Sequence, residues 1–253
     1  MRKILSIFSK VNPNPLFILG NPKSGTTIIA NLLSKATKKT LTSDIKSVIK
    51  HTTLKLDFKL LSFDYFIKKH KYEFSKEIIK EPFLSFYTEE LIKSFPNAKF
   101  IWIVRNPYQN IRSILNRLKI PGDFQEINFN HFPELEKTPA WKLNLQSSMF
   151  GYISFNYIEA MAFRWNHAVN IYKQHKDRIV LVKYEDFILD KKKYIEDLAL
   201  NLGFSIQTDI SNYVNIQHQP KGNAEIDLKE FFGEENYKII ERLCNENMKE
   251  LGY

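Results

Sequence analysis

The chain has 253 residues, of which 43% are hydrophobic, and this composition is typical of one globular domain rather than a disordered segment. Its formal net charge of +9 comes from scattered lysines without a long basic tail, which disfavours nucleic-acid binding. No apolar run approaches the ~20 residues of a membrane span, and the apolar stretch within residues 1–10 is too short for a secretion signal. With Cys244 as the single cysteine, we expect a soluble, cytoplasmic protein without a membrane partner.

Short apolar runs alternate with helical patterns along the chain. The runs, which read as buried strands, cover residues 16–19, 78–79, 100–104 and 179–182. Apolar stripes at helical spacing lie within residues 28–33, 158–172 and 237–251. This alternation predicts an α/β fold with one domain over residues 1–253, in which helices flank a central parallel sheet, as in the P-loop kinases in outline.

Residues 120–157 interrupt the alternation and are rich in Pro, Asn and aromatic side chains. We interpret them as a long, partly helical insertion, and such insertions are often lids or binding loops. Its aromatic residues either line a pocket or anchor the loop to the core. They are Trp141, Phe150, Tyr152, Phe155 and Tyr157.

A phosphate-binding loop is indicated where the first strand ends. Residues 20–27 read Gly-Asn-Pro-Lys-Ser-Gly-Thr-Thr and precede an apolar helix. The first N–H groups of a helix have no helical partners, and the helix dipole adds positive potential, so this junction favours an anion. Lys23 adds a charge to the loop, and Thr26 and Thr27 add hydroxyl donors.

The loop differs from the nucleotide-binding pattern G-x-x-x-x-G-K-[ST]. Gly20 and Gly25 have the right spacing, but Thr26 stands where the lysine belongs, and Lys23 lies inside the loop. The strand over residues 100–104 is followed by Arg105 rather than by the Asp that holds Mg²⁺ in those enzymes. Lysine and arginine without a metal suit a ligand with less charge than ATP, so no metal site is expected.

Arg105 and Ser113 indicate a second anion site. Pro107 can begin the helix that follows Arg105, and Ser113 lies two turns into that helix. An arginine fork and a hydroxyl together suit a phosphate dianion. A surface salt bridge for Arg105 and a solvent-facing Ser113 are the alternatives.

The paired motifs resemble those of the sulfotransferases that use 3′-phosphoadenosine 5′-phosphosulfate (PAPS). Residues 22–27 are similar to the 5′-phosphosulfate loop of that superfamily, and residues 105–107 with Ser113 are similar to its 3′-phosphate motif. The likeness continues through residues 95–99, 182–186 and 251–253. It implies PAPS as co-substrate and 3′-phosphoadenosine 5′-phosphate (PAP) as product.

The resemblance also implies roles for later residues. A Tyr at the place of Tyr184 contacts adenine in the family, although core packing is the alternative here. Lys221 and Gly222 occupy the place of a Lys-Gly pair that contacts the 3′-phosphate, but Pro220 stands where cytosolic members have Arg. The expected donor-binding residues are Lys23, Ser24, Gly25, Thr26, Thr27, Arg105, Ser113, Tyr184, Lys221 and Gly222.

The expected catalytic groups are Lys23, Lys80 and Glu81. Lys23 should neutralise the oxygen between phosphorus and sulfur as the sulfur–oxygen bond breaks. Family members place a Lys at the position of Lys80, where it contacts the sulfonate, followed by a base, which predicts Glu81 for that role.

Other assignments for the base remain open. Pro82 stands where the cytosolic enzymes have a His, and Glu81 is alternatively a surface carboxylate paired with Lys80. Other branches of the family place a Glu after the first helix, and Asp44 or His51 are the candidates for that position.

Other functions also remain open. A P-loop nucleotide kinase is disfavoured by Thr26, and a non-catalytic protein that binds PAPS or PAP is disfavoured by the presence of Lys23. A basic nucleic-acid-binding protein is the third alternative. The acceptor is expected to be a small molecule, as in secondary metabolism, ahead of a glycan or a protein tyrosine.

Overall fold

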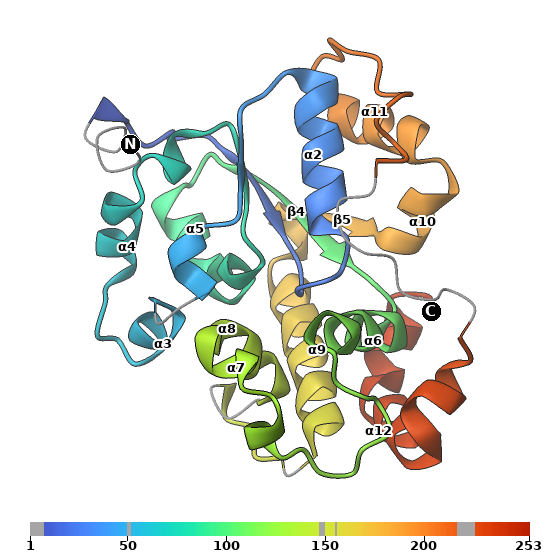
Figure 1. Cartoon of the computed structure of the whole chain (residues 1–253). Helices are drawn as coiled ribbons and strands as arrows, with labels where there is room; N and C mark the ends of the chain where they lie inside the picture. The colour runs from blue at the N-terminus through green and yellow to red at the C-terminus, as the bar shows by residue number, and fades with distance from the viewer. Residues whose placement is uncertain (1–7, 50–51, 147–149, 155, 217–225) are drawn as a thin grey trace.

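The computed structural model describes residues 8–49, 52–146, 150–154, 156–216 and 226–253. Within these residues, five parallel strands form one sheet in the order β2-β3-β1-β4-β5 (Figure 1). The strands are β1 Leu16–Leu19, β2 Leu41–Ser43, β3 Ile78–Lys80, β4 Lys99–Val104 and β5 Val180–Lys183. The predicted α/β fold with a central parallel sheet is confirmed, and each predicted strand is found within one residue of its expected bounds.

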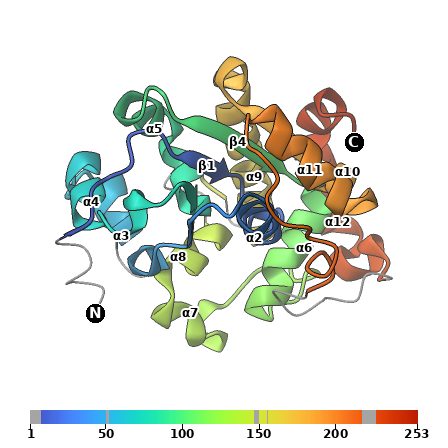
Figure 2. The same cartoon turned by 90° about the horizontal axis from the view of Figure 1, so that it is seen from above.

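Alternating strand side chains build an apolar core on each face of the sheet. Leu16 and Ile18 point to one face, whereas Phe17 and Leu19 point to the other. The first face is covered by α2 Thr26–Thr37, α10 Tyr184–Leu189 and α11 Lys191–Asn201. The second core includes α4 Phe63–Lys69, α5 Thr88–Ser94, α6 Pro107–Leu118, α9 Tyr157–Gln174 and α12 Leu228–Glu250. Figure 2 shows α4 and the α10–α11 pair on opposite sides of the molecule.

The three predicted helical stripes lie in α2, α9 and α12. Helix α9 begins after Asn156, whose Oδ1 accepts hydrogen bonds from the amides of Ile158 and Glu159. Helix α12 is broken at Gly233, where φ is 67°, so the stripe at 237–251 lies after the break. None of the described helices combines the length and the apolar character needed to cross a membrane.

The sequence does not predict strand β2. It has three residues, and Thr42 alone among them is buried, so no apolar run marks it. Its place is decided by pairing with β3, where Ser43 lies opposite Lys80. As a consequence Asp44, the next residue, reaches the edge of the sheet at which β3 ends.

Within the 120–157 segment, the described residues are partly helical and pack against the second core beside α9 (Figure 1). Its elements are η4 Phe129–His131, α7 Glu134–Lys137, α8 Pro139–Lys142 and η5 Leu143–Leu145. Leu135 and Leu145 are buried in that core. Tyr157 is buried as well, and its hydroxyl donates to the Pro121 carbonyl at 2.6 Å, so this aromatic residue anchors the segment.

Asn236 of α12 ties the two ends of this segment together. Its fully buried amide nitrogen donates to the carbonyl oxygens of Gly122 and Phe124 at 2.8 and 2.9 Å. Its amide oxygen accepts from Asn156 Nδ2 at 3.0 Å. One side chain thus joins the start of the segment to the cap of α9.

Asn236→Ala should lower the free energy of unfolding by about 2–3 kcal/mol, because it removes three hydrogen bonds and leaves the buried Gly122 carbonyl group without this partner. Urea unfolding followed by circular dichroism measures the change. Asn201→Ala on the exposed surface of α11 is the matched control and should stay within about 0.5 kcal/mol of the wild type. Equal effects of the two substitutions would contradict the anchoring role of Asn236.

Candidate active site

The loop over residues 20–25 turns the chain sharply from β1 into α2. Gly20 has φ 139°, and a Cβ atom there would lie 2.3 Å from the Ile103 carbonyl oxygen. Gly25 has φ 97°, and a Cβ atom there would lie 2.2 Å from the Tyr184 ring. Lys23 also has a positive φ, 68°, which is uncommon for a residue with a side chain. The loop therefore requires glycine at two positions and holds Lys23 in a strained backbone conformation.

Helix α2 begins without a side-chain cap, because Gly25 stands at its N-cap position. Thr26 is buried in its first turn, and Thr27 is partly buried beside it. Amide groups at such a helix terminus can bind an oxyanion, and the Thr27 hydroxyl lies at the same end. The predicted loop residues are thus assembled around one helix terminus.

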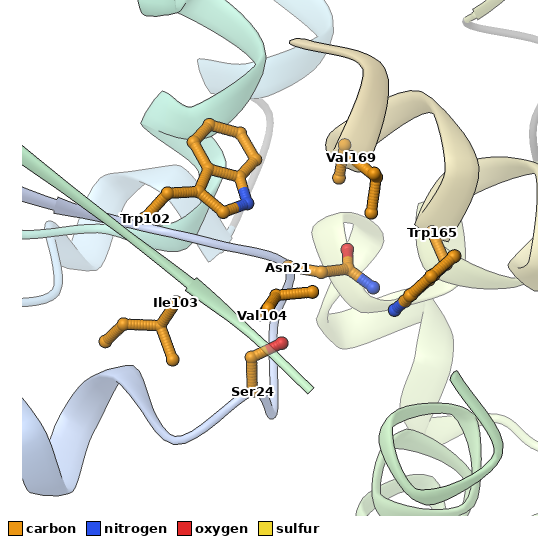
Figure 3. A pocket seen from close by; sticks show the side chains of 8 residues that line it. Asn21, Ser24, Trp102, Ile103, Val104, Trp165 and Val169 are labelled. Atoms are coloured by element: carbon orange, nitrogen blue, oxygen red, sulfur yellow. The ribbon is translucent and has the colours of Figure 1, made fainter. Parts of the chain in front are cut away.

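Buried polar side chains support the loop from below. Asn110 of α6 donates to the Pro22 carbonyl oxygen at 2.9 Å and to Ser24 Oγ at 3.0 Å. Asn21 in turn donates to Asn110 Oδ1 at 2.8 Å. Figure 3 shows Asn21 and Ser24 at a small cavity between β4 and α9, with Trp165 on its far side. Ser24 therefore has a supporting contact in addition to its predicted role in donor binding.

Arg105 connects the two predicted motifs. It follows β4, and its Nη1 donates to the Lys23 carbonyl oxygen at 3.2 Å. Its guanidinium lies over the Tyr184 ring, 4.7 Å from the ring centre, and its buried Nε has no hydrogen-bond partner. Ser113 lies two turns into α6 and is partly buried. The contacts of Arg105 thus bring three predicted residues, Lys23, Arg105 and Tyr184, together.

Further arginines of α6 join this group, and the sequence reasoning did not select them. Arg112 is buried, and its Nη1 has no hydrogen-bond partner. Burial, followed by the charges of Arg117 and Arg105, lowers the pKa of Lys23 to about 8. A cluster of cations this close favours an anionic ligand. The sequence signal for these residues is the pair of arginines, Arg112 and Arg117, in the helix that follows Pro107.

Lys80 lies beside Asp44 at the end of β3. It is 1% exposed, and its Nζ donates to Asp44 Oδ1 at 2.5 Å and to Thr27 Oγ1 at 3.1 Å. The side chain of Asp44 is 46% exposed, and its φ of 73° lies in the left-handed region. The predicted sulfonate contact and one of the two alternative bases are therefore adjacent, next to the phosphate loop.

Glu81 is engaged with the backbone. Its Oε2 accepts from the Ile45 amide at 2.8 Å, and its Oε1 accepts from the Phe83 amide at 3.1 Å, which caps η3 Pro82–Tyr87. Burial, and then the charge of Asp44, raise the pKa of Glu81 to about 7. The Glu81 carboxylate thus holds the segment after β2 and the segment after β3 together.

His51, Lys221, Gly222 and Phe155 lie outside the described residues. Among the residues that the structure describes, His, Cys, Asp and Glu side chains form no group of three or more that could hold a metal ion.

Residues 50–208, more than half of the chain, match the model of the Sulfotransferase family. The chain belongs to the sulfotransferase family. The matched region includes Arg105, Ser113 and Tyr184 but begins after the loop of Lys23. The loop resembles the family's phosphosulfate loop by its own sequence, so the family match over residues 50–208 and the loop support each other. Among the functions considered, they favour a sulfotransferase over a nucleotide kinase.

Solved structures agree in fold with this sulfotransferase. Mouse sulfotransferase SULT7A1, solved with PAP, superposes with a TM-score of 0.58 at 16% identity, covering 98% of this chain and 88% of that one. Sulfotransferase STF9 from Mycobacterium avium gives a TM-score of 0.55 at 14% identity, covering 97% of this chain and 78% of that one. No curated protein sequence matches the chain. At these identities the structural likeness shows the fold alone.

The cation cluster of this sulfotransferase predicts how Lys23 titrates. In the free protein its pKa should be about 8, and Arg117→Gln should raise it, because one repelling charge is removed. Carbon-13 NMR of labelled lysine methylene groups measures the titration, with Lys23→Arg identifying the resonance. Arg178 precedes β5 and donates to the Pro96 carbonyl oxygen, at the opposite edge of the sheet from Lys23. Arg178→Gln should therefore leave the Lys23 pKa unchanged. A wild-type pKa at the usual value of 10.5 would show that Lys23 lies away from the other cations.

Proposed function

We propose that this sulfotransferase transfers a sulfuryl group from PAPS to a hydroxyl or amine of a small-molecule acceptor. The observation that carries this proposal is the hydrogen bond from Arg105 to the backbone of Lys23. It joins two cationic loops, so a single ligand with an anionic group at each end can bind both. PAPS is such a ligand, since its phosphosulfate and 3′-phosphate lie on opposite sides of one ribose.

The donor-binding residues are assigned by their place in this pair of loops. In the proposal, the first turn of α2 with Ser24, Thr26 and Thr27 holds the 5′-phosphosulfate. Arg105 and Ser113 hold the 3′-phosphate. The unpaired Nε of Arg105 and the unpaired Nη1 of Arg112 supply donors for that phosphate, so Arg112 joins the predicted set. Tyr184, Lys221 and Gly222 stay as predicted contacts of adenine and of the 3′-phosphate.

The transfer forms a bond between the acceptor oxygen or nitrogen and sulfur and breaks the bond from sulfur to the bridging oxygen. That oxygen leaves with additional negative charge on the 5′-phosphate of PAP. Lys23 is proposed to neutralise this charge, which is larger in the transition state than in the ground state. Lys80, held by Thr27, is proposed to bind a sulfuryl oxygen, so lysine and arginine charges serve in place of a metal ion.

The acceptor must also lose a proton, and we propose Asp44 rather than Glu81 as the base. Both oxygens of Glu81 accept backbone hydrogen bonds, and the residue is 6% exposed. Asp44 is half-exposed and contacts Lys80, the proposed sulfuryl ligand. Its left-handed backbone conformation, which costs free energy, is consistent with a constrained functional position. Glu81 then positions the Asp44 segment through its bond to the amide of Ile45.

We further propose that the enzyme works in the cytoplasm on a small metabolite, as in secondary metabolism. Its single cysteine, Cys244, is a free thiol buried in the core, which suits a reducing compartment.

The donor site is tested by comparing PAP with AMP. PAP should bind at least about ten-fold more tightly, and Arg105→Ala should remove most of that difference, because the lost charge-assisted hydrogen bonds go to the 3′-phosphate. Calorimetry with both nucleotides measures the two affinities. Arg242→Ala, an exposed arginine of α12, is the control and should behave as the wild type. Equal binding of PAP and AMP by the wild type would reject the proposed 3′-phosphate site.

The base is tested with two isosteric substitutions. Asp44→Asn should lower kcat about 10²-fold or more and leave PAP binding nearly unchanged, because it removes basicity and keeps shape. Glu81→Gln should mainly lower stability, because a neutral amide replaces an acceptor of two backbone N–H groups. Steady-state rates with PAPS and a screened acceptor, together with thermal unfolding, separate the two effects. Normal kcat in Asp44→Asn with a large loss in Glu81→Gln would make Glu81 the base.

A further inference from the structure

Arg164 of α9 is a buried cation close to the site. It is 4% exposed, and its Nε donates to Asn21 Oδ1, in the donor loop, at 3.3 Å. Its guanidinium lies 4.3 Å from the ring centre of Phe86, which belongs to the segment after β3, and 5.3 Å from that of Phe150, in the 120–157 segment. Arg164 therefore lies where three segments meet: the donor loop, the segment after Lys80 and the segment that we expect to cover the acceptor.

The hydrogen bonds of Arg164 are incomplete. Its Nη1 is buried and has no partner. A buried guanidinium with an unpaired N–H is costly, and such groups in native proteins commonly mark a place for a ligand or an ordered water. Burial lowers the pKa of Arg164 to about 9, so the group is still charged at neutral pH. A buried positive charge of this kind favours an anion.

The charges around Arg164 set it apart from the donor site. The carboxylate whose charge acts on Arg164 is that of Asp57, at the end of α3 Thr52–Asp57. Asp57 Oδ1 accepts from the Tyr87 hydroxyl, while its buried Oδ2 has no partner. The pKa of His167, one turn along α9, is lowered by burial and then by the charge of Arg164. The pKa of Lys23, in contrast, is lowered by burial and then by the charges of Arg117 and Arg105.

Aromatic rings form the nearest cover of the guanidinium. The Phe86 and Phe150 ring centres are 4.7 Å apart, and both rings stack on the ring of His167. A phenyl ring can move aside without breaking a hydrogen bond, so this cover can open for a ligand. A charged fork beside flat apolar rings suits a planar anion such as a carboxylate.

We propose that Arg164 binds a carboxylate of the acceptor, so that the substrates are organic acids that carry the hydroxyl or amine to be sulfated. This inference rests on the proposed function, because it assigns the acceptor side of the same site. The acid group pairs with Arg164 Nη1, and Asp57 opposes it with a repelling charge. Arg164 is thereby a specificity-determining residue that does not take part in the transfer.

Acid and amide pairs of otherwise identical probes test this proposal. The first pair is 4-hydroxyphenylacetate and 4-hydroxyphenylacetamide, followed by further phenol and alcohol acids, each with its amide. Calorimetry in the presence of saturating PAP gives the acid-to-amide affinity ratio for each pair. In the wild type the best acid should bind about 10- to 100-fold more tightly than its amide, as expected for one charge-assisted contact. Arg164→Gln should bring this ratio close to one. Because Arg164 also donates to Asn21 of the donor loop, the affinity of the variant for PAP is measured first and the ratio is taken at a PAP concentration that saturates the variant.

Asp57→Asn gives an independent readout that a purely structural arginine would not show. It keeps the oxygen that accepts from Tyr87 and removes the repelling charge, so binding of the acid should become tighter while binding of the amide stays the same. It also decides the matter if Arg164→Gln fails to fold. Arg242→Gln on the exposed face of α12 is the matched control and should keep the wild-type ratio.

Failure of this inference is distinguishable from failure of the proposed function. A wild type that does not bind PAP would reject the donor site. A wild type that binds PAP but prefers no acid over its amide would reject the role of Arg164 alone. An acid preference that persists in Arg164→Gln, or acid binding that is unchanged or weaker in Asp57→Asn, would make Arg164 a structural cation and would overturn the proposal.

Discussion

The functional architecture depends on one constraint, which is that cations from several strand ends share one edge of the sheet. Parallel strands all end at the same edge, so Lys23 after β1, Lys80 at the end of β3 and Arg105 after β4 are brought together. Burial of Lys23, followed by repulsion from the charges of Arg117 and Arg105, lowers its pKa to about 8. A polyanionic ligand relieves both costs, so the arrangement that is unfavourable in the free protein is the one that favours binding.

Buried polar side chains hold this edge in shape. Asn110 supports the phosphate loop through Ser24 and the Pro22 carbonyl oxygen. Glu81 joins the ends of β2 and β3 through two backbone amides, and it thereby sets the position of Asp44 next to Lys80. The bond from Asn110 to Ser24 and the bonds to Glu81 from two backbone amides are buried, so the loss of any of them leaves a buried group without a partner.

The proposed acceptor side differs from the donor side in the number of its charged groups and in their surroundings. Around the donor loops, cations gather and carry unpaired N–H groups. At Arg164 a single cation lies beside two aromatic rings and is influenced by the charge of Asp57, and Arg164 and Asp57 each have one buried atom without a partner. The donor side therefore provides net charge, whereas the acceptor side provides one charged contact within apolar walls, an arrangement that selects among acceptors by the presence of an acid group.

The sequence by itself determined the parallel α/β fold, four of the five strands among the described residues and the strand ends that carry Lys23 and Arg105, because apolar runs and glycine-rich turns are local patterns. It could not determine which carboxylate contacts Lys80 and which is held by backbone amides. Asp44 reaches that place only through β2, a strand stabilised by pairing rather than by its own residues, and Glu81 is turned toward backbone amides. Arg164 stands among the apolar residues of the helical stripe at 158–172, and no local sequence pattern distinguishes it. Its burial and its unpaired nitrogen arise from segments more than a hundred residues apart in the chain, and only the tertiary structure brings these together.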